Sequence, residues 1–196
     1  MSTTVKAKGD FKQVPAGTHP AYCYAVIDIG RQESHYGVKS QLILSFEFPH
    51  ELVEYEGEQR PMVMSAFYTA SISKKARLRE DLEAWRGKPF TTAELDGFEL
   101  KNVIGKPCTI SVTHNEEGKA RVNGVSAIMK GINMPAMFHR PLWFDVDEHG
   151  EGSPQFAEVP EWIQQIIKKR VVDFHKGPAG MGATPGDPAF DDDIPF

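Results

Sequence analysis

Long apolar segments are missing from this sequence. No run of about 18 apolar residues occurs in the 196-residue chain, so the sequence contains no candidate transmembrane helix. The N-terminal residues also lack the apolar stretch of a secretory signal peptide. We therefore expect a cytoplasmic protein that does not act at a membrane.

Cysteine is scarce, and the residue groupings of common enzymes are missing. Cys23 and Cys108 are the only cysteines and belong to no C-x-x-C motif, which argues against a disulfide framework. The seven histidines lie at least ten residues apart, so they lack the spacing of a zinc site. Lys88 and Lys106 each follow a glycine but precede proline instead of the Ser or Thr of a phosphate-binding loop. We expect no enzyme, no cofactor and no metal.

Basic residues are absent from the last twenty positions, GPAGMGATPGDPAFDDDIPF. Four aspartates there account for −4 of the net charge of −5, which leaves residues 1–176 at about −1. Glycine or proline occupies seven of the fourteen positions from 177 to 190. This composition predicts a disordered acidic tail over 177–196, tethered to a nearly neutral body. A neutral body does not indicate nucleic-acid binding, but it permits a local basic groove.

Alternating side chains predict two strands near the N-terminus. In residues 21–29, the odd positions from Cys23 to Ile29 would form one aliphatic face, and Tyr22 and Tyr24 would point to the other. In residues 39–48, Leu42, Leu44, Phe46 and Phe48 would face inward, whereas Lys39, Gln41, Ser45 and Glu47 would face outward. The polar residues 30–37 between them predict a hairpin loop.

The order of the remaining elements favours an OB-fold. We expect a third strand over 61–72, a helix from an N-cap at Ser73 to a stop at Gly87, a capping box from Thr91 to Glu94, and strands over 107–114 and 119–129. Three strands, a helix and two strands predict a mainly β, five-stranded OB-fold barrel with its helix between strands 3 and 4. An SH3-like barrel or a split αβ sandwich would also tolerate this pattern. The barrel would span 1–130, followed by an aromatic arm and a helix from Pro160 within 131–176.

One face of this barrel has the residue types that bind single-stranded DNA. Aromatic side chains on a strand can stack on bases of any sequence, and neighbouring basic or polar side chains can contact the phosphates. The candidate DNA-binding residues come from the first two strands and the loop joining them, from the third strand, and from the last strand: Tyr22, Tyr24, Arg31, His35, Tyr36, Lys39, Gln41, Phe67, Lys119, Arg121 and Asn123.

The end of the chain resembles a known protein family. Its last residues look like the acidic tip of bacterial single-stranded-DNA-binding proteins: Asp191, Asp192, Asp193, Ile194, Pro195 and Phe196. Several segments of residues 11–130 are similar to a family of bacteriophage single-stranded-DNA-binding proteins: AGTHPA at 16–21, IDIGRQ at 27–32, FEFP at 46–49, GKPF at 87–90 and GKPC at 105–108.

The resemblance implies an OB-fold protein that coats single-stranded DNA during phage replication, recombination and repair in the host cytoplasm. It also implies that the acidic tip recruits partner proteins. A partner pocket could hold Phe196 and Ile194 while a basic rim holds the carboxylates. Residues 131–176 have no matched counterpart. Two alternatives remain open: a strand-annealing or recombination protein, and an OB module that binds protein or sugar instead of DNA.

Removal of Asp191 to Phe196 should leave DNA affinity unchanged or raise it, because the deletion removes negative charges that compete with phosphate. The same deletion should abolish recruitment of partner enzymes, measured by pull-down. One residue added after Phe196 should also impair recruitment, since it moves the carboxylate away from the ring, but should barely alter DNA binding. Complete loss of DNA binding on deletion would show that the tail belongs to the fold.

Overall fold

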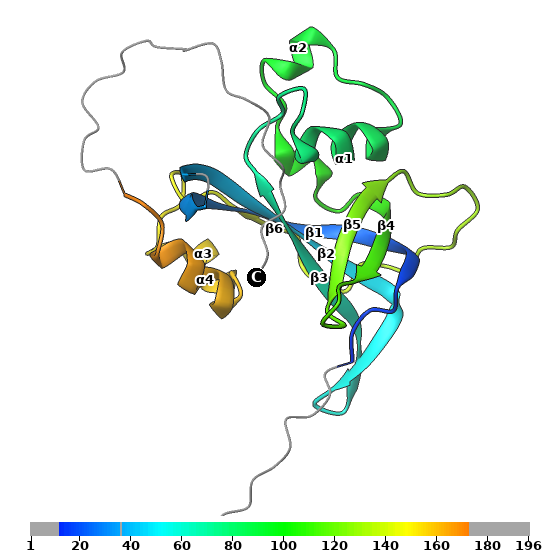
Figure 1. Cartoon of the computed structure of the whole chain (residues 1–196). Helices are drawn as coiled ribbons and strands as arrows, with labels where there is room; N and C mark the ends of the chain where they lie inside the picture. Colours follow the sequence, from blue (N-terminus) through cyan, green and yellow to red (C-terminus); the bar gives the residue numbers. More distant parts are fainter. Residues whose placement is uncertain (1–11, 36, 173–196) are drawn as a thin grey trace, which may run out of the picture.

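The structure is a computed structural model that describes residues 12–35 and 37–172 (Figure 1). Tyr36 and the tail at 177–196 lie outside the described residues. The expectation of a mainly β protein is confirmed. The strands are β1 (Gly17–Ser34), β2 (Gly37–Tyr55), β3 (Glu58–Thr69), β4 (Pro107–His114), β5 (Ala120–Ser126) and β6 (Leu142–Phe144).

The strands form one open sheet. Its order is β3-β2-β1-β4-β5 with antiparallel pairing throughout, and the short β6 adds to β1 in parallel at Ala25 to Ile27. β3 and β5, the two ends of this order, approach each other, but no ladder joins them within the described residues. The sheet is therefore not a closed barrel.

The first two strands are longer than the sequence predicted. Pairing of β1 with β2 continues to Ser34 opposite Gly37, so the expected loop over 30–37 is wrong for most of its length. The third strand, expected over 61–72, begins earlier as well, because β2 and β3 are joined by a turn in which Glu56 and Gly57 both have positive φ. Polar residues in a twisted two-stranded ribbon can pair without an apolar face, so hydrophobic periodicity does not reveal them.

β-bulges interrupt the pairing of β1 with β2 at two places, between Cys23 and Ala25 and between Asp28 and Gly30. The first shift moves the side chains that follow it to the opposite face of the sheet. Cys23 and Val26 therefore belong to one hydrophobic core, whereas Ala25, Ile27 and Ile29 belong to another. The expectation that Cys23, Ala25, Ile27 and Ile29 share one face is wrong for this reason.

The two cores cover the two faces of β1–β3. The first core lies under α1 (Arg77–Arg86) and contains side chains of α1 and of β1 to β5. Its buried residues include Leu42, Leu44, Phe46, Phe48, Leu78, Leu82, Trp85 and Ile110. The second core lies under β6, α3 (Pro154–Glu158) and α4 (Glu161–Lys168), with Ile43, Phe144, Ile163 and Ile167 buried in it. Figure 1 shows α1 and the α3–α4 pair on opposite sides of the sheet.

The helix boundaries agree in part with the sequence. Gly87 ends α1 in the left-handed conformation (φ 68°), as expected, but the N-cap is Ala76, so the prediction of Ser73 as N-cap is wrong. Thr91 and Glu94 form the predicted capping box of α2 (Thr92–Leu95), and a 3-10 turn, η1 (Leu100–Val103), follows. Pro160, the predicted first residue of the last helix, is the N-cap of α4, which begins one residue later. No helix of the described residues is long and apolar enough to cross a bilayer.

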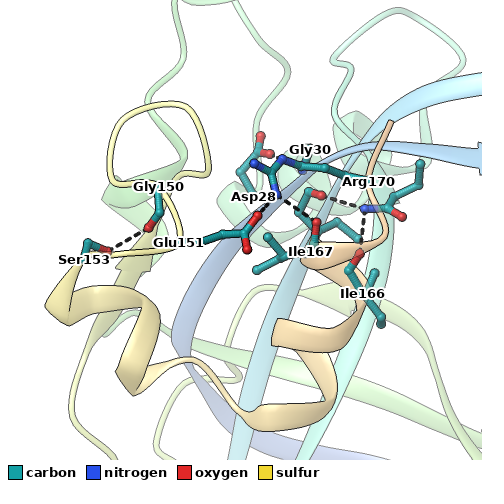
Figure 2. A network of polar contacts seen from close by, with 10 residues as sticks. Asp28, Gly30, Gly150, Glu151, Ser153, Ile166, Ile167 and Arg170 are labelled. Atoms are coloured by element: carbon teal, nitrogen blue, oxygen red, sulfur yellow. Dashed lines mark hydrogen bonds and ion pairs between the residues drawn. The ribbon is translucent and has the colours of Figure 1, made fainter. Parts of the chain in front are cut away.

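The end of α4 and the residues after it pack against β1 and Glu151 (Figure 2). Arg170 pairs with Glu151, and the Gln32 side chain donates to the Ile166 carbonyl at 3.3 Å. Gly30 has a φ of +73°, and a Cβ there would lie 2.8 Å from Cδ of Arg170. Only glycine permits this backbone conformation and this close approach without strain. The anchor fixes the C-terminal helices on the face that carries the second core.

Asp81 on α1 joins the two free edges of the sheet. Its carboxylate accepts a hydrogen bond from the Tyr68 hydroxyl of β3 at 2.8 Å and another from the Val125 amide of β5 at 3.1 Å. Arg77 lies 3.6 Å from the same carboxylate and donates to the Val122 carbonyl at 2.6 Å. Burial raises the pKa of Asp81, although the hydrogen bonds from Tyr68 and Val125 act to lower it.

Substitution Asp81→Ala should lower the free energy of unfolding by about 2–4 kcal/mol, because it leaves the buried Tyr68 hydroxyl and Val125 amide without an acceptor. Urea denaturation followed by circular dichroism would measure the change. The matched control is Glu80→Ala, since Glu80 is exposed on the same helix; we expect a change within about 0.5 kcal/mol. Equal stability of both variants would show that the bridge between β3 and β5 does not hold the sheet.

Candidate nucleic-acid interface

A chain segment crosses the sheet face on which the sequence places Tyr22 and Tyr24. We name residues 127–141 the strap. The Tyr22 hydroxyl donates to the Pro135 carbonyl of the strap at 3.1 Å. The Tyr24 ring stacks on the imidazole of His139, with centroids 4.7 Å apart and planes at 27°. The predicted stacking residues therefore share one face, as expected, but both contact the strap.

Glu47 fastens the strap to β2. The side chain of Glu47 has no exposed surface. Its carboxylate accepts hydrogen bonds from the amides of Phe138 (2.9 Å) and His139 (2.8 Å), and it lies 2.8 Å from Nδ1 of His139. Burial acts to raise the pKa of Glu47, but the hydrogen bonds from His139 and Phe138 outweigh it, and the pKa lies below its usual value. The strap thus supplies the donors that keep a buried carboxylate ionised.

Beside the strap lies a groove of about 790 Å³ between β1, β3 and the C-terminal helices. Aromatic side chains from three separate parts of the chain line it, namely Tyr24 of β1, His139 of the strap and Trp162 of α4. The remaining lining residues are Val63, Met64, Ser65, Arg140, Leu142, Glu158 and Pro160. The groove presents aromatic and apolar surface with one cationic and one anionic side chain.

One aromatic ring of this groove is well exposed to solvent. Tyr55, Phe138 and Trp162 are the aromatic members among the exposed large apolar residues of the described chain, and of these Trp162 lines the groove. Trp162 is 47% exposed and packs at its other side against Phe67, with centroids 6.1 Å apart. Phe138 is 53% exposed and contacts the His139 ring edge-to-face. An exposed ring in a groove is available to stack on a planar ligand.

The other predicted residues are distributed over three places. On the strap side, Gln41 is buried and Phe67 is half-buried beneath Trp162. Arg31, His35 and Lys39 lie near the tip of the β1–β2 hairpin, where the Arg31 carbonyl accepts from the Val171 amide at 2.7 Å.

The third place is β5 and the turn before it. Lys119 pairs with Glu117 at 2.7 Å, and Arg121 and Asn123 are exposed on β5. β5 pairs with β4 at the far end of the sheet order, and none of these residues lines the groove. The structure therefore brings Tyr24 and Phe67 together with Trp162, but it does not bring the β5 residues to them.

The predicted site residues did not include His139, Arg140 or Trp162. A signal for Trp162 was present in the sequence. Ile163, Ile166 and Ile167 form the apolar stripe of the last helix, and Trp162 lies outside it. An aromatic residue outside the apolar stripe of a helix faces solvent. Arg140 follows Phe138 and His139 in an aromatic segment, which is a weaker signal. No group of three His, Cys, Asp or Glu side chains that could hold a metal ion occurs within residues 12–35 and 37–172.

Glu47→Gln should destabilise the protein by about 1–3 kcal/mol near neutral pH, because the amide loses charge-assisted hydrogen bonds. A carboxyl group with a lowered pKa stabilises the fold above its unfolded pKa of about 4.5 and loses that contribution as the pH falls below it. The difference between wild type and variant should therefore shrink below pH 4.5. Denaturant titrations across this range would measure it, and a difference independent of pH would contradict the assignment.

None of the protein-family models compared with this chain matches it, and none of the curated protein sequences does.

Proposed function

We propose that this chain binds single-stranded DNA with little dependence on sequence, with bases stacking in the groove. The observation that carries the proposal is the gathering of Tyr24, His139 and Trp162 beside Arg140 in one exposed groove. Every base has an aromatic face, so a stacking surface accepts any sequence, and a nearby arginine can contact phosphate or stack on a base. Bases within a duplex are already stacked and paired, so the groove would favour unpaired strands.

The topology supports an OB-fold as the scaffold for this activity. The order β3-β2-β1-β4-β5 is that of an OB barrel opened between β3 and β5. α1 follows β3 in the chain, precedes β4, and lies against both β3 and β5 at this opening. OB-folds bind oligonucleotides on the side that includes strands 2 and 3, and β3 supplies Val63, Met64 and Ser65 to the groove.

In the cell, the protein would coat exposed strands during phage DNA replication, recombination and repair in the host cytoplasm. The acidic tip would recruit the enzymes that act on those strands, while the groove holds the DNA. Strand annealing is compatible with the same groove. A separate observation favours a second candidate, a protein-binding module: Val63, Met64, Leu142 and Pro160 make much of the groove apolar, and Glu158 balances Arg140.

Trp162→Ala should weaken binding to an unstructured oligothymidylate by about 1–3 kcal/mol, the usual loss for one stacked base. Fluorescence anisotropy with labelled single-stranded and duplex DNA of equal length, each at two salt concentrations, would measure it. Wild-type protein should prefer the single strand, and its affinity should fall as salt rises, because phosphate contacts release counterions.

The matched control is Tyr55→Ala, since Tyr55 is also an exposed aromatic residue but lies at the end of β2, away from the groove. This variant should bind like wild type. Equal affinity of the wild type for duplex and single strand would contradict the proposal. Wild-type affinity in Trp162→Ala would instead show that the groove is not where the bases lie.

A further inference from the structure

The strap is attached to the sheet without a hydrophobic anchor of its own. None of the side chains of residues 127–141 is buried. Hydrogen bonds hold it to the sheet: Nε2 of His50 lies 3.2 Å from the Asn133 carbonyl, Tyr22 donates to the Pro135 carbonyl, and Glu47 holds the amides of Phe138 and His139. The stacked pair of Tyr24 and His139 adds one ring contact. Segments with little buried apolar surface open at low free-energy cost, because their polar groups can exchange protein partners for water.

The strap covers the residues that best fit a DNA-binding strand face. Tyr22 and Tyr24 both lie under it, and His139 occupies the ring face of Tyr24 with the near-parallel geometry that a stacked base would adopt. The covered face is continuous with the groove, since Tyr24 and His139 line both. A strand seated in the groove beside Trp162 would therefore reach the edge of the strap.

We infer that the strap is a displaceable cover over a second stacking surface, which single-stranded DNA uncovers by replacing His139 on Tyr24. This inference rests on the proposed function. On displacement, Glu47 releases the Phe138 and His139 amides to water, and the Tyr22 hydroxyl loses the Pro135 carbonyl. A base then takes the place of the imidazole on Tyr24. The groove is accessible to DNA before binding. The face under the strap becomes accessible only when the strap is displaced, and it then extends the binding surface.

Glu47 is the positioning residue of the closed strap, and Glu47→Gln tests that role. Glutamine keeps the size of the side chain but points an NH2 group at one of the strap's donors, so the strap loosens. If DNA binding requires the strap to open, a loosened strap lowers the free-energy cost of opening. The affinity for oligothymidylate should then rise by about fivefold. The same variant is expected to be less stable. Stability and affinity should thus change in opposite directions, which loss of folded protein would not produce.

The matched control is Glu51→Gln. Glu51 lies on the same strand and also pairs with a histidine, Nδ1 of His19 at 3.1 Å, but it does not contact the strap. This variant should bind oligothymidylate with wild-type affinity. A similar rise in both variants would overturn the role of Glu47, because it would reflect the lost charge alone. A fall in affinity in Glu47→Gln would show that the closed strap is part of the bound state.

The decisive measurement is amide hydrogen exchange of Phe138 and His139 by NMR, with the full chain free and saturated with oligothymidylate. Both amides should be protected in the free protein and should exchange faster in the complex. Unchanged or slower exchange in the complex, with binding confirmed by anisotropy, would overturn the inference and leave the proposed function intact. Absence of binding by both wild type and Glu47→Gln would overturn both. Binding by Glu47→Gln but not by the wild type would support the inference that the strap covers a DNA-binding surface.

Discussion

The link between β3 and β5 through Asp81 is the constraint on which the rest of the structure depends. An open, twisted sheet leaves two edges with unpaired backbone groups, and a small β protein must cover or connect them. Here one carboxylate connects them, because it accepts from Tyr68 on β3 and from Val125 on β5. The bridge requires α1 to lie at the opening, where Leu78, Leu82 and Trp85 then close the first core. Burial of an ionisable group costs free energy, and its two hydrogen bonds offset that cost.

Curvature of the sheet toward α1 leaves the opposite face of β1 and β2 to be covered by other parts of the chain. The bulge after Cys23 turns Ala25, Ile27 and Ile29 toward that face, and aliphatic side chains there cannot remain exposed to water. The C-terminal helices cover these residues, whereas the strap covers the polar end around Glu47. One face of the sheet therefore has a tightly packed half and a polar half, and the groove lies where the two meet.

How far the sequence predicts this protein depends on the range of each interaction. Leu42, Leu44, Phe46 and Phe48 were predicted correctly to face one core, because alternation within one regular strand is a local property. The face of Ala25 was predicted wrongly, because a bulge arises from pairing between strands and leaves no mark in the periodicity. Glu47 was predicted to face outward; it does point away from the first core, but its side chain has no exposed surface. Its burial under residues 138–139 is a contact across about ninety positions, which no local pattern encodes. The groove needed Tyr24, His139 and Trp162 together. Only Tyr24 was among the predicted residues, because the meeting of the three depends on contacts between distant parts of the chain.

The buried carboxylate also constrains how DNA could lie on this surface. A polyanion avoids an ionised carboxylate in a region of low dielectric constant, so phosphates would not approach Glu47. Bases carry no net charge, and they could stack on Tyr24 beside it. Arg140 is exposed at the groove and is cationic, so it favours phosphates at the solvent side of the groove. The charges of Glu47 and Arg140 therefore favour one orientation of a bound strand, with bases directed toward the sheet and the backbone directed toward solvent.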